Sequence, residues 1–132
     1  MSRLGIAIFG SVVAVSALAQ DGVSKMTKDE LMSFLPGTKV TQITEAGSER
    51  HWTNEPNGTL MATSNNKLYG SQSSAQVYAH PGTWIVNGEG KYCLDIDWKS
   101  VHEKWCSFIL KDADGTYYLN RVDPKRKIEF AK

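Results

Sequence analysis

The residues of this sequence that could do chemistry begin with its two cysteines, Cys93 and Cys106, which lie in two segments with an alternating, strand-like pattern. A redox pair is usually spaced C-x-x-C beside a helix N-terminus, which lowers a thiol pKa, and this spacing is far longer. A zinc site needs about four ligands, and the cysteines with His102 supply three. The pattern therefore favours a structural disulfide over a redox or metal site.

An antiparallel register with the cysteines opposite each other makes further predictions about the two strands. Asp95 then lies opposite Lys104. Asp97 lies opposite His102 in the same way. Both are favourable cross-strand pairs on the cysteine face. The opposite face is apolar and should face the core.

The three histidines, His51, His80 and His102, lie in separate segments without the close spacing of a metal or catalytic group. No serine lies in a G-x-S-x-G elbow. An enzyme would need a pocket in which His51 or His102 meets an acid and a nucleophile. Because no such set can be assembled from spacing, we expect no enzyme, no cofactor and no bound metal.

The first 19 residues carry Arg3, an apolar run and a small-residue end, which predicts a secretory signal peptide. Their apolar run is shorter than the roughly 20 residues that span a bilayer, so no stable membrane insertion is expected. We predict a flexible lead over residues 20–26 and one disulfide-stapled β domain over residues 27–132. The protein should be periplasmic or secreted, where disulfides persist.

The charge of the chain is nearly balanced, with 15 basic and 14 acidic residues. Nucleic-acid binding requires a strong positive field, so no nucleic-acid partner is expected. The local exception is the run Lys125-Arg126-Lys127 near the C-terminus. A charge run of this kind is typical of a solvated tail.

The fold is predicted from a change in periodicity near Thr38. Before it, Thr27 and Glu30 form a capping box for a short helix that ends at Pro36-Gly37, and Leu31 is on its apolar face. After it, alternating segments are separated by turn signals such as Asn-Gly. We expect a mainly β fold, an antiparallel meander of seven to eight strands bent into a partial barrel, with one short N-terminal helix.

The candidate binding residues are aromatic and serine side chains. In the segment "ERHWTN", alternation places Arg50 and Trp52 on one face and His51 on the other. A small apolar ligand would require an internal cavity lined by Trp52, Trp84 and Tyr92. The full set of candidate binding residues is Trp52, Tyr69, Ser71, Ser73, Tyr78 and Trp84.

The segment "GTWIVNGEGKYCLDIDWKSVHEKWCSFILKDADGTYYL" resembles a family of uncharacterised exported proteobacterial proteins, a domain of unknown function. The resemblance rests on a Gly-x-Trp strand, two cysteines, an aromatic strand end and a closing tyrosine strand, here Gly82, Trp84, Cys93, Trp98, Cys106 and Tyr118. It implies a bacterial envelope setting and carries no activity with it. A looser similarity links the loop Tyr69–Ala75 to small barrel inhibitors of lysozyme.

These observations together predict a small exported binding or interaction domain of the bacterial envelope. Its partner would be an envelope or extracellular protein or a small ligand. The alternatives are a periplasmic lysozyme inhibitor that uses the Tyr69–Ala75 loop, and a carrier of a small apolar ligand.

Overall fold

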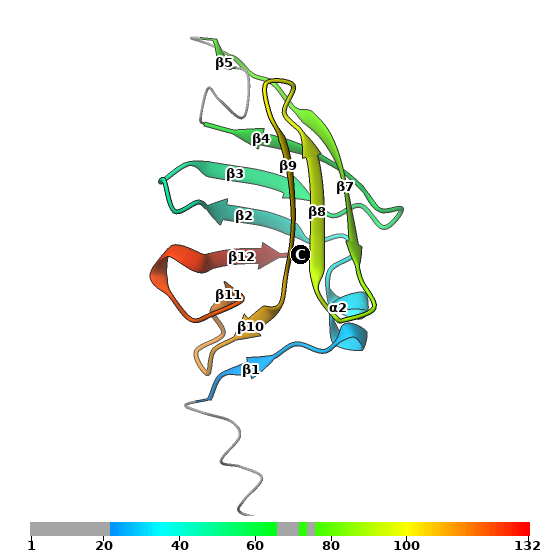
Figure 1. Ribbon diagram of the computed structural model, residues 1–132, viewed down its shortest axis with the longest axis vertical. Helices are drawn as coiled ribbons and strands as arrows, with labels where there is room; N and C mark the ends of the chain where they lie inside the picture. The colour runs from blue at the N-terminus through cyan, green and yellow to red at the C-terminus, as the bar shows by residue number, and fades with distance from the viewer. Residues whose placement is uncertain (1–21, 66–71, 74–75) are drawn as a thin grey trace, which may run out of the picture.

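The computed structural model describes residues 22–65, 72–73 and 76–132 of the chain. In this part, ten strands form one antiparallel sheet that curls into a half-barrel (Figure 1). The spatial order of its strands is β1 (Ser24–Lys25), β10 (Ile109–Lys111), β11 (Tyr117–Leu119), β12 (Lys127–Ala131), β2 (Lys39–Ile43), β3 (Glu49–Thr53), β4 (Thr59–Ser64), β7 (His80–Val86), β8 (Tyr92–Asp97) and β9 (His102–Ser107). A separate short hairpin pairs β5 (Gln72–Ser73) with β6 (Gln76–Val77).

The curl of the sheet follows from one short connection. Strand β9 is an edge strand, and only Phe108 separates it in sequence from β10, which lies near the other edge. A flat sheet would hold these strands many strand widths apart, since neighbouring strands are about 4.8 Å apart. The chain can pass directly from β9 to β10 only if the sheet bends around, as Figure 1 shows. The predicted partial barrel is therefore confirmed.

The short helix α2 (Lys28–Phe34) lies at one end of the half-barrel, beside the turn between β7 and β8 (Figure 1). Its predicted capping box is present: the backbone N–H of Glu30 donates to Thr27 Oγ1 at 3.1 Å, and Thr27 N–H donates to Glu30 Oε1 at 2.8 Å. Leu31 and Leu35 are fully buried in the core. In the described part of the chain, no helix has the length and apolar character needed to cross a membrane.

The core fills the space inside the half-barrel with large side chains from both halves of the sheet. Tyr92, at the centre, is fully buried, and its hydroxyl accepts a hydrogen bond from Trp52 Nε1 at 3.0 Å. The same hydroxyl donates to Asn54 Oδ1 at 2.5 Å. This network connects β8 to β3 across the interior, so the two halves are held by polar as well as apolar contacts.

The predicted disulfide is confirmed, with an S–S distance of 2.06 Å between Cys93 and Cys106. The predicted register is also confirmed, because Asp95 pairs with Lys104 and Asp97 with His102. The His102 ring does not bond to the residue opposite it. Its Nε2 lies 2.5 Å from Asp95 Oδ1, on the diagonal neighbour of the same face.

Strand β12 was missed by the sequence analysis, which predicted that the cations at residues 125–127 form a solvated tail. Lys125 and Arg126 instead form the 3₁₀ turn η3 (Pro124–Arg126), and Lys127 begins β12. This strand pairs with both β11 and β2, and its Ile128 is almost fully buried. At the opposite end of the chain, the short strand β1 lies within the segment predicted as a flexible lead and pairs with β10.

Candidate functional site

A polar layer lies inside the half-barrel at the end far from helix α2. Gln42 lies opposite Arg50, and Arg50 lies opposite Ser64, on three neighbouring strands. These positions are two residues along from Val40 and Trp52 in the core, so they face inward as well. Arg50 and Ser64 are buried. The interior therefore changes from apolar to polar along the strands.

The central group of this layer is the carboxylate of Glu103 on β9. Its Oε2 accepts hydrogen bonds from Arg50 at 2.5 Å and from Trp105 Nε1 at 2.8 Å. Its Oε1 accepts from Trp98 Nε1 at 2.8 Å. The Arg50 guanidinium also lies over the Trp98 ring, 5.6 Å from its centroid. A buried ion pair is favoured when further hydrogen bonds satisfy its charged groups, and the two indoles supply such bonds to the carboxylate.

A cavity of about 310 Å³, which we call the mouth cavity, opens from this layer to the surface. It lies where β2 ends and η3 leads into β12. Its lining residues are Gln42, Thr44, Glu45, Arg50, Glu103, Trp105, Ser107, Leu119, Lys125, Arg126 and Lys127. Four of these carry a positive charge and two carry a carboxylate, so the lining has an excess of positive charge.

The cations at the mouth are held by a defined turn. The Asp123 side chain accepts a hydrogen bond from the Lys125 backbone N–H at 2.9 Å and caps η3. This hydrogen bond lowers the pKa of Asp123, and Arg121 lowers it further. Arg126 Nε lies 3.2 Å from Glu45 Oε2 on the facing turn. The backbone of the cationic run and the Arg126 side chain are therefore fixed next to the cavity.

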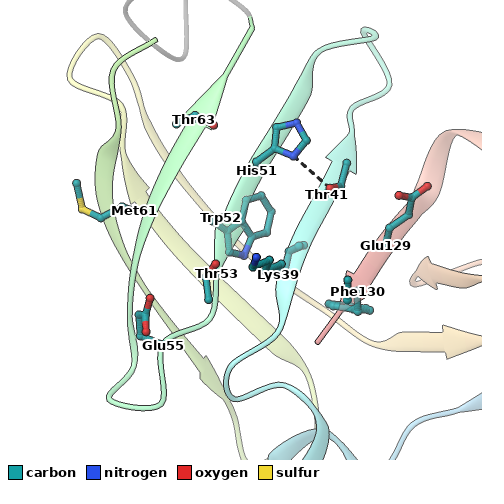
Figure 2. Close-up of a pocket in the computed structure, with 12 residues that line it drawn as sticks. Lys39, Thr41, His51, Trp52, Thr53, Glu55, Met61, Thr63, Glu129 and Phe130 are labelled. Carbon is teal, nitrogen blue, oxygen red and sulfur yellow. Dashed lines mark hydrogen bonds between the residues drawn. The ribbon is translucent and has the colours of Figure 1, made fainter.

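A second hollow, which we call the outer groove, lies on the outer face of β12, β2, β3 and β4 (Figure 2). Its volume is about 600 Å³. Outward side chains from the four strands line it, among them threonines, the exposed Met61, Lys39 and Glu129. Because the sheet is continuous here, the outer groove is a surface feature and does not connect to the mouth cavity through the core.

His51 lies in the outer groove and meets both an acid and a hydroxyl. Its Nδ1 is 3.1 Å from Thr41 Oγ1 (Figure 2). Its Nε2 is 2.7 Å from Glu49 Oε2. Acyl transfer by such a set would also need N–H donors aimed at the developing oxyanion. Both β2 and β3 have partner strands on each side, so their backbone N–H groups serve the sheet. The contacts orient the His51 ring on an exposed surface.

The predicted apolar cavity is not found at the residues that were expected to line it. Trp52 and Trp84 are 4% and 6% exposed, and each contacts Tyr92. The three rings pack on one another as the core. Sequence reasoning could not separate a cavity lining from a core, because both need large apolar side chains.

The remaining candidate residues fall in or near the least described segment. Tyr78 is exposed. Tyr69 and Ser71, and with them most of the Tyr69–Ala75 loop, lie outside the described residues. Ser73 contributes its backbone to β5, and its side chain lies outside the described part. Of these residues, only the side chain of Tyr78 lies in the described part, and it does not line the mouth cavity.

The polar layer was only partly visible in the sequence. The prediction that Arg50 and Trp52 share one face is confirmed, since both are buried and Trp52 lies opposite Val40. Glu103 was not singled out by the sequence analysis; it lies in β9, where its carboxylate meets Arg50. Its inward position could have been suspected, because Val101 and Trp105 are each two positions away from it. Among the described residues, no group of three or more His, Cys, Asp or Glu side chains could hold a metal.

The fold and the mouth cavity define a class of protein: a small antiparallel half-barrel, closed by one helix, stapled by one disulfide and charged at its open end. The chain belongs to the family described as Protein of unknown function (DUF995), whose family model matches residues 11–123. The predicted resemblance to an uncharacterised domain family is confirmed at this level. No curated protein and no solved structure matches the chain significantly.

Proposed function

We propose that this protein is an exported, non-catalytic binding domain of the bacterial envelope that takes a small ligand at the mouth cavity. The observation that carries the proposal is the buried Arg50–Glu103 ion pair at the base of a solvent-open cavity. Replacing such a pair by apolar side chains of similar volume is often neutral or stabilising. A charged pair kept at a cavity base therefore favours a role in recognition over a role in folding.

Export is supported by two independent features. The first 19 residues have the composition of a signal peptide. The disulfide joins β8 to the edge strand β9, and disulfides of this kind persist in oxidising compartments. An envelope or extracellular setting gives both features one explanation.

The two alternative functions are supported less well. A carrier of an apolar ligand would need the interior space that Trp52, Trp84 and Tyr92 occupy with their own rings. A lysozyme inhibitor would use the Tyr69–Ala75 loop, and this stays a prediction. If the loop inserts into a lysozyme cleft, substitution of both Ser71 and Ser73 by alanine should abolish inhibition in a cell-wall lysis assay.

The proposed function can be tested through the four tryptophan indoles of the oxidised, ¹⁵N-labelled protein. Trp98 and Trp105 donate to Glu103 at the base of the cavity, whereas Trp52 and Trp84 donate to groups in or near the core. Small-molecule fractions of an envelope extract would be added while the indole N–H resonances are followed. A fraction that moves the first two signals and leaves the other two unchanged supports the proposal. If no fraction moves them, the mouth cavity is not a ligand site.

A further inference from the structure

Resting on this proposed function, we infer that the ligand of the mouth cavity is a small organic anion, a carboxylate or phosphate joined to an aromatic or aliphatic body. The first reason is charge. Four cations and two carboxylates line the cavity, and both carboxylates already face cations. Glu103 bonds to Arg50 and Glu45 lies beside Arg126. The positive excess of the lining comes from Lys125 and Lys127, which have Asp123 and Asp114 near them outside the lining.

The second reason is that the backbone that carries the cations is ordered before any ligand arrives. Besides the Asp123 cap, the Arg126 backbone N–H donates to the Asp123 carbonyl at 2.8 Å, which closes the turn. Lys127 then enters β12, a strand with partners on both sides. A turn that is ordered in advance loses little conformational entropy on binding. This distinguishes the segment from a flexible basic tail.

The third reason is the apolar wall beside the charges. Trp105 and Leu119 line the same cavity, and the Trp105 indole N–H is fixed by Glu103. The Trp105 ring also packs edge-on against Tyr92, with centroids 5.9 Å apart. A fixed aromatic surface next to a cationic rim fits a ligand with one charged end and one apolar end. A volume of about 310 Å³ is at the small end of ligand pockets, which limits the ligand to one ring or a short chain.

The experiment compares three probes that share one phenyl ring: benzoate, the neutral benzamide of the same shape, and phenyl phosphate. Each is titrated into the oxidised ¹⁵N-labelled protein, with dissociation constants taken from the Trp105 indole signal. Charge-assisted hydrogen bonds are about twice as strong as neutral ones, so an anion should bind at least about tenfold more tightly than benzamide. The affinity of the anion should fall as the salt concentration is raised, because Arg126 at the opening of the cavity is partly exposed. The tighter of the two anions identifies carboxylate or phosphate as the charged end.

Three variants test the charges with opposite expected signs. Arg126→Gln removes a rim cation and should weaken anion binding by about fivefold or more. Glu45→Gln removes the acid beside it and should strengthen anion binding by about two- to fivefold. Lys104→Gln is the control: it removes one positive charge, as Arg126→Gln does, but on the outer face of β9. It should leave the dissociation constant unchanged. All three positions are exposed or half-buried, so the variants should fold.

The outcomes separate this inference from the proposed function. If anions bind more tightly than benzamide, and Arg126→Gln and Glu45→Gln change the affinity in opposite directions, both the inference and the proposed function are supported. Benzamide binding as tightly as benzoate, with Arg126→Gln and Lys104→Gln alike, overturns the inference and leaves the cavity as a ligand site. If none of the three probes shifts the Trp105 signal, while an extract fraction still shifts the Trp98 and Trp105 signals, the inference is overturned and the proposed function stands. If neither the probes nor the extract shifts these signals, both the inference and the proposed function are overturned.

Discussion

Substitution of Tyr92 by phenylalanine should lower the free energy of unfolding by about 3 kcal/mol although it removes one oxygen atom. The hydroxyl is fully buried, accepts from Trp52 Nε1 at 3.0 Å and donates to Asn54 Oδ1 at 2.5 Å. Its loss leaves one donor and one acceptor without a partner inside the core. Each such group costs about 1–3 kcal/mol, and the ring itself is kept, so no large cavity adds to the cost.

The measurement is urea unfolding of the oxidised protein at neutral pH, followed by far-UV circular dichroism. The urea midpoint should fall in Tyr92→Phe with the slope of the transition unchanged, because the surface exposed on unfolding is the same. The matched control is Tyr118→Phe, a half-buried position, which should change stability by less than about 0.5 kcal/mol. A loss below about 1 kcal/mol for Tyr92→Phe would refute the argument that its hydroxyl connects the two halves of the sheet.

The same variant should also change the response to alkali. Burial raises the pKa of Tyr92, and its hydrogen bonds with Trp52 and Asn54 oppose this effect only in part. Above about pH 10 the unfolded chain loses this proton and the folded protein keeps it, so stability falls as pH rises. The fall is up to about 1.4 kcal/mol per pH unit for one such group, and Tyr92→Phe should lack it. Parallel stability curves for the two proteins between about pH 9 and 11 would contradict this origin of the slope.

Three further substitutions test separate parts of the structure. Replacing both Cys93 and Cys106 by serine should lower the free energy of unfolding by about 3 kcal/mol, measured by urea titration. The reduced wild-type protein should show the same loss. Gly82→Ala should lower the free energy of unfolding by about 2 kcal/mol or more in the same titration, since the added Cβ would lie 2.6 Å from a backbone oxygen. Gly88→Ala, the control, adds its Cβ in open space and should leave stability unchanged. Arg50→Met leaves the buried carboxylate of its partner without a cation and should cost about 3–5 kcal/mol by thermal and urea unfolding; a neutral result would show that the two indoles suffice.

The hairpin of β8 and β9 was predictable in detail because its constraints are local. The two cysteines fix one pair of opposite residues, and this register fixes every other pair of the hairpin. The period of two then decides which face each side chain is on. The helix was predictable for the same reason, since Thr27 and Glu30 stand three positions apart. What the register could not give was the direction of a long side chain. His102 therefore reaches Asp95, where direct pairing predicted Asp97.

Strand β12 was missed because its signal is weak beside that of the charges before it. The run Lys125-Arg126-Lys127 follows a proline, and this pattern is typical of a tail. The alternation of Ile128 and Phe130 with charged residues was present but covers only one strand's length. Its position between β11 and β2 depends on distant partners, and such pairing is not encoded in one segment.

The mouth cavity could not be assembled from the sequence because its parts come from distant segments. Arg50 and Glu103 are separated by 53 positions and meet only because the sheet curls. A tryptophan indole needs a partner when it is buried, so Trp98 and Trp105 predict an acceptor nearby without naming it. The acceptor becomes visible only when β9 is placed next to the interior.

The distribution of polar groups inside the half-barrel argues for recognition at one end and stability at the other. Next to helix α2, the interior is filled by leucines from the helix and by the core rings, which supply burial without charge. At the open end, Arg50 and Glu103 occupy inward positions where apolar residues would satisfy the fold at least as well. The two indoles that fix this pair also set one wall of the cavity, so the ion pair and the apolar surface are positioned together. A staple and a core alone do not require that arrangement, whereas the proposed site for a small amphipathic anion uses both parts.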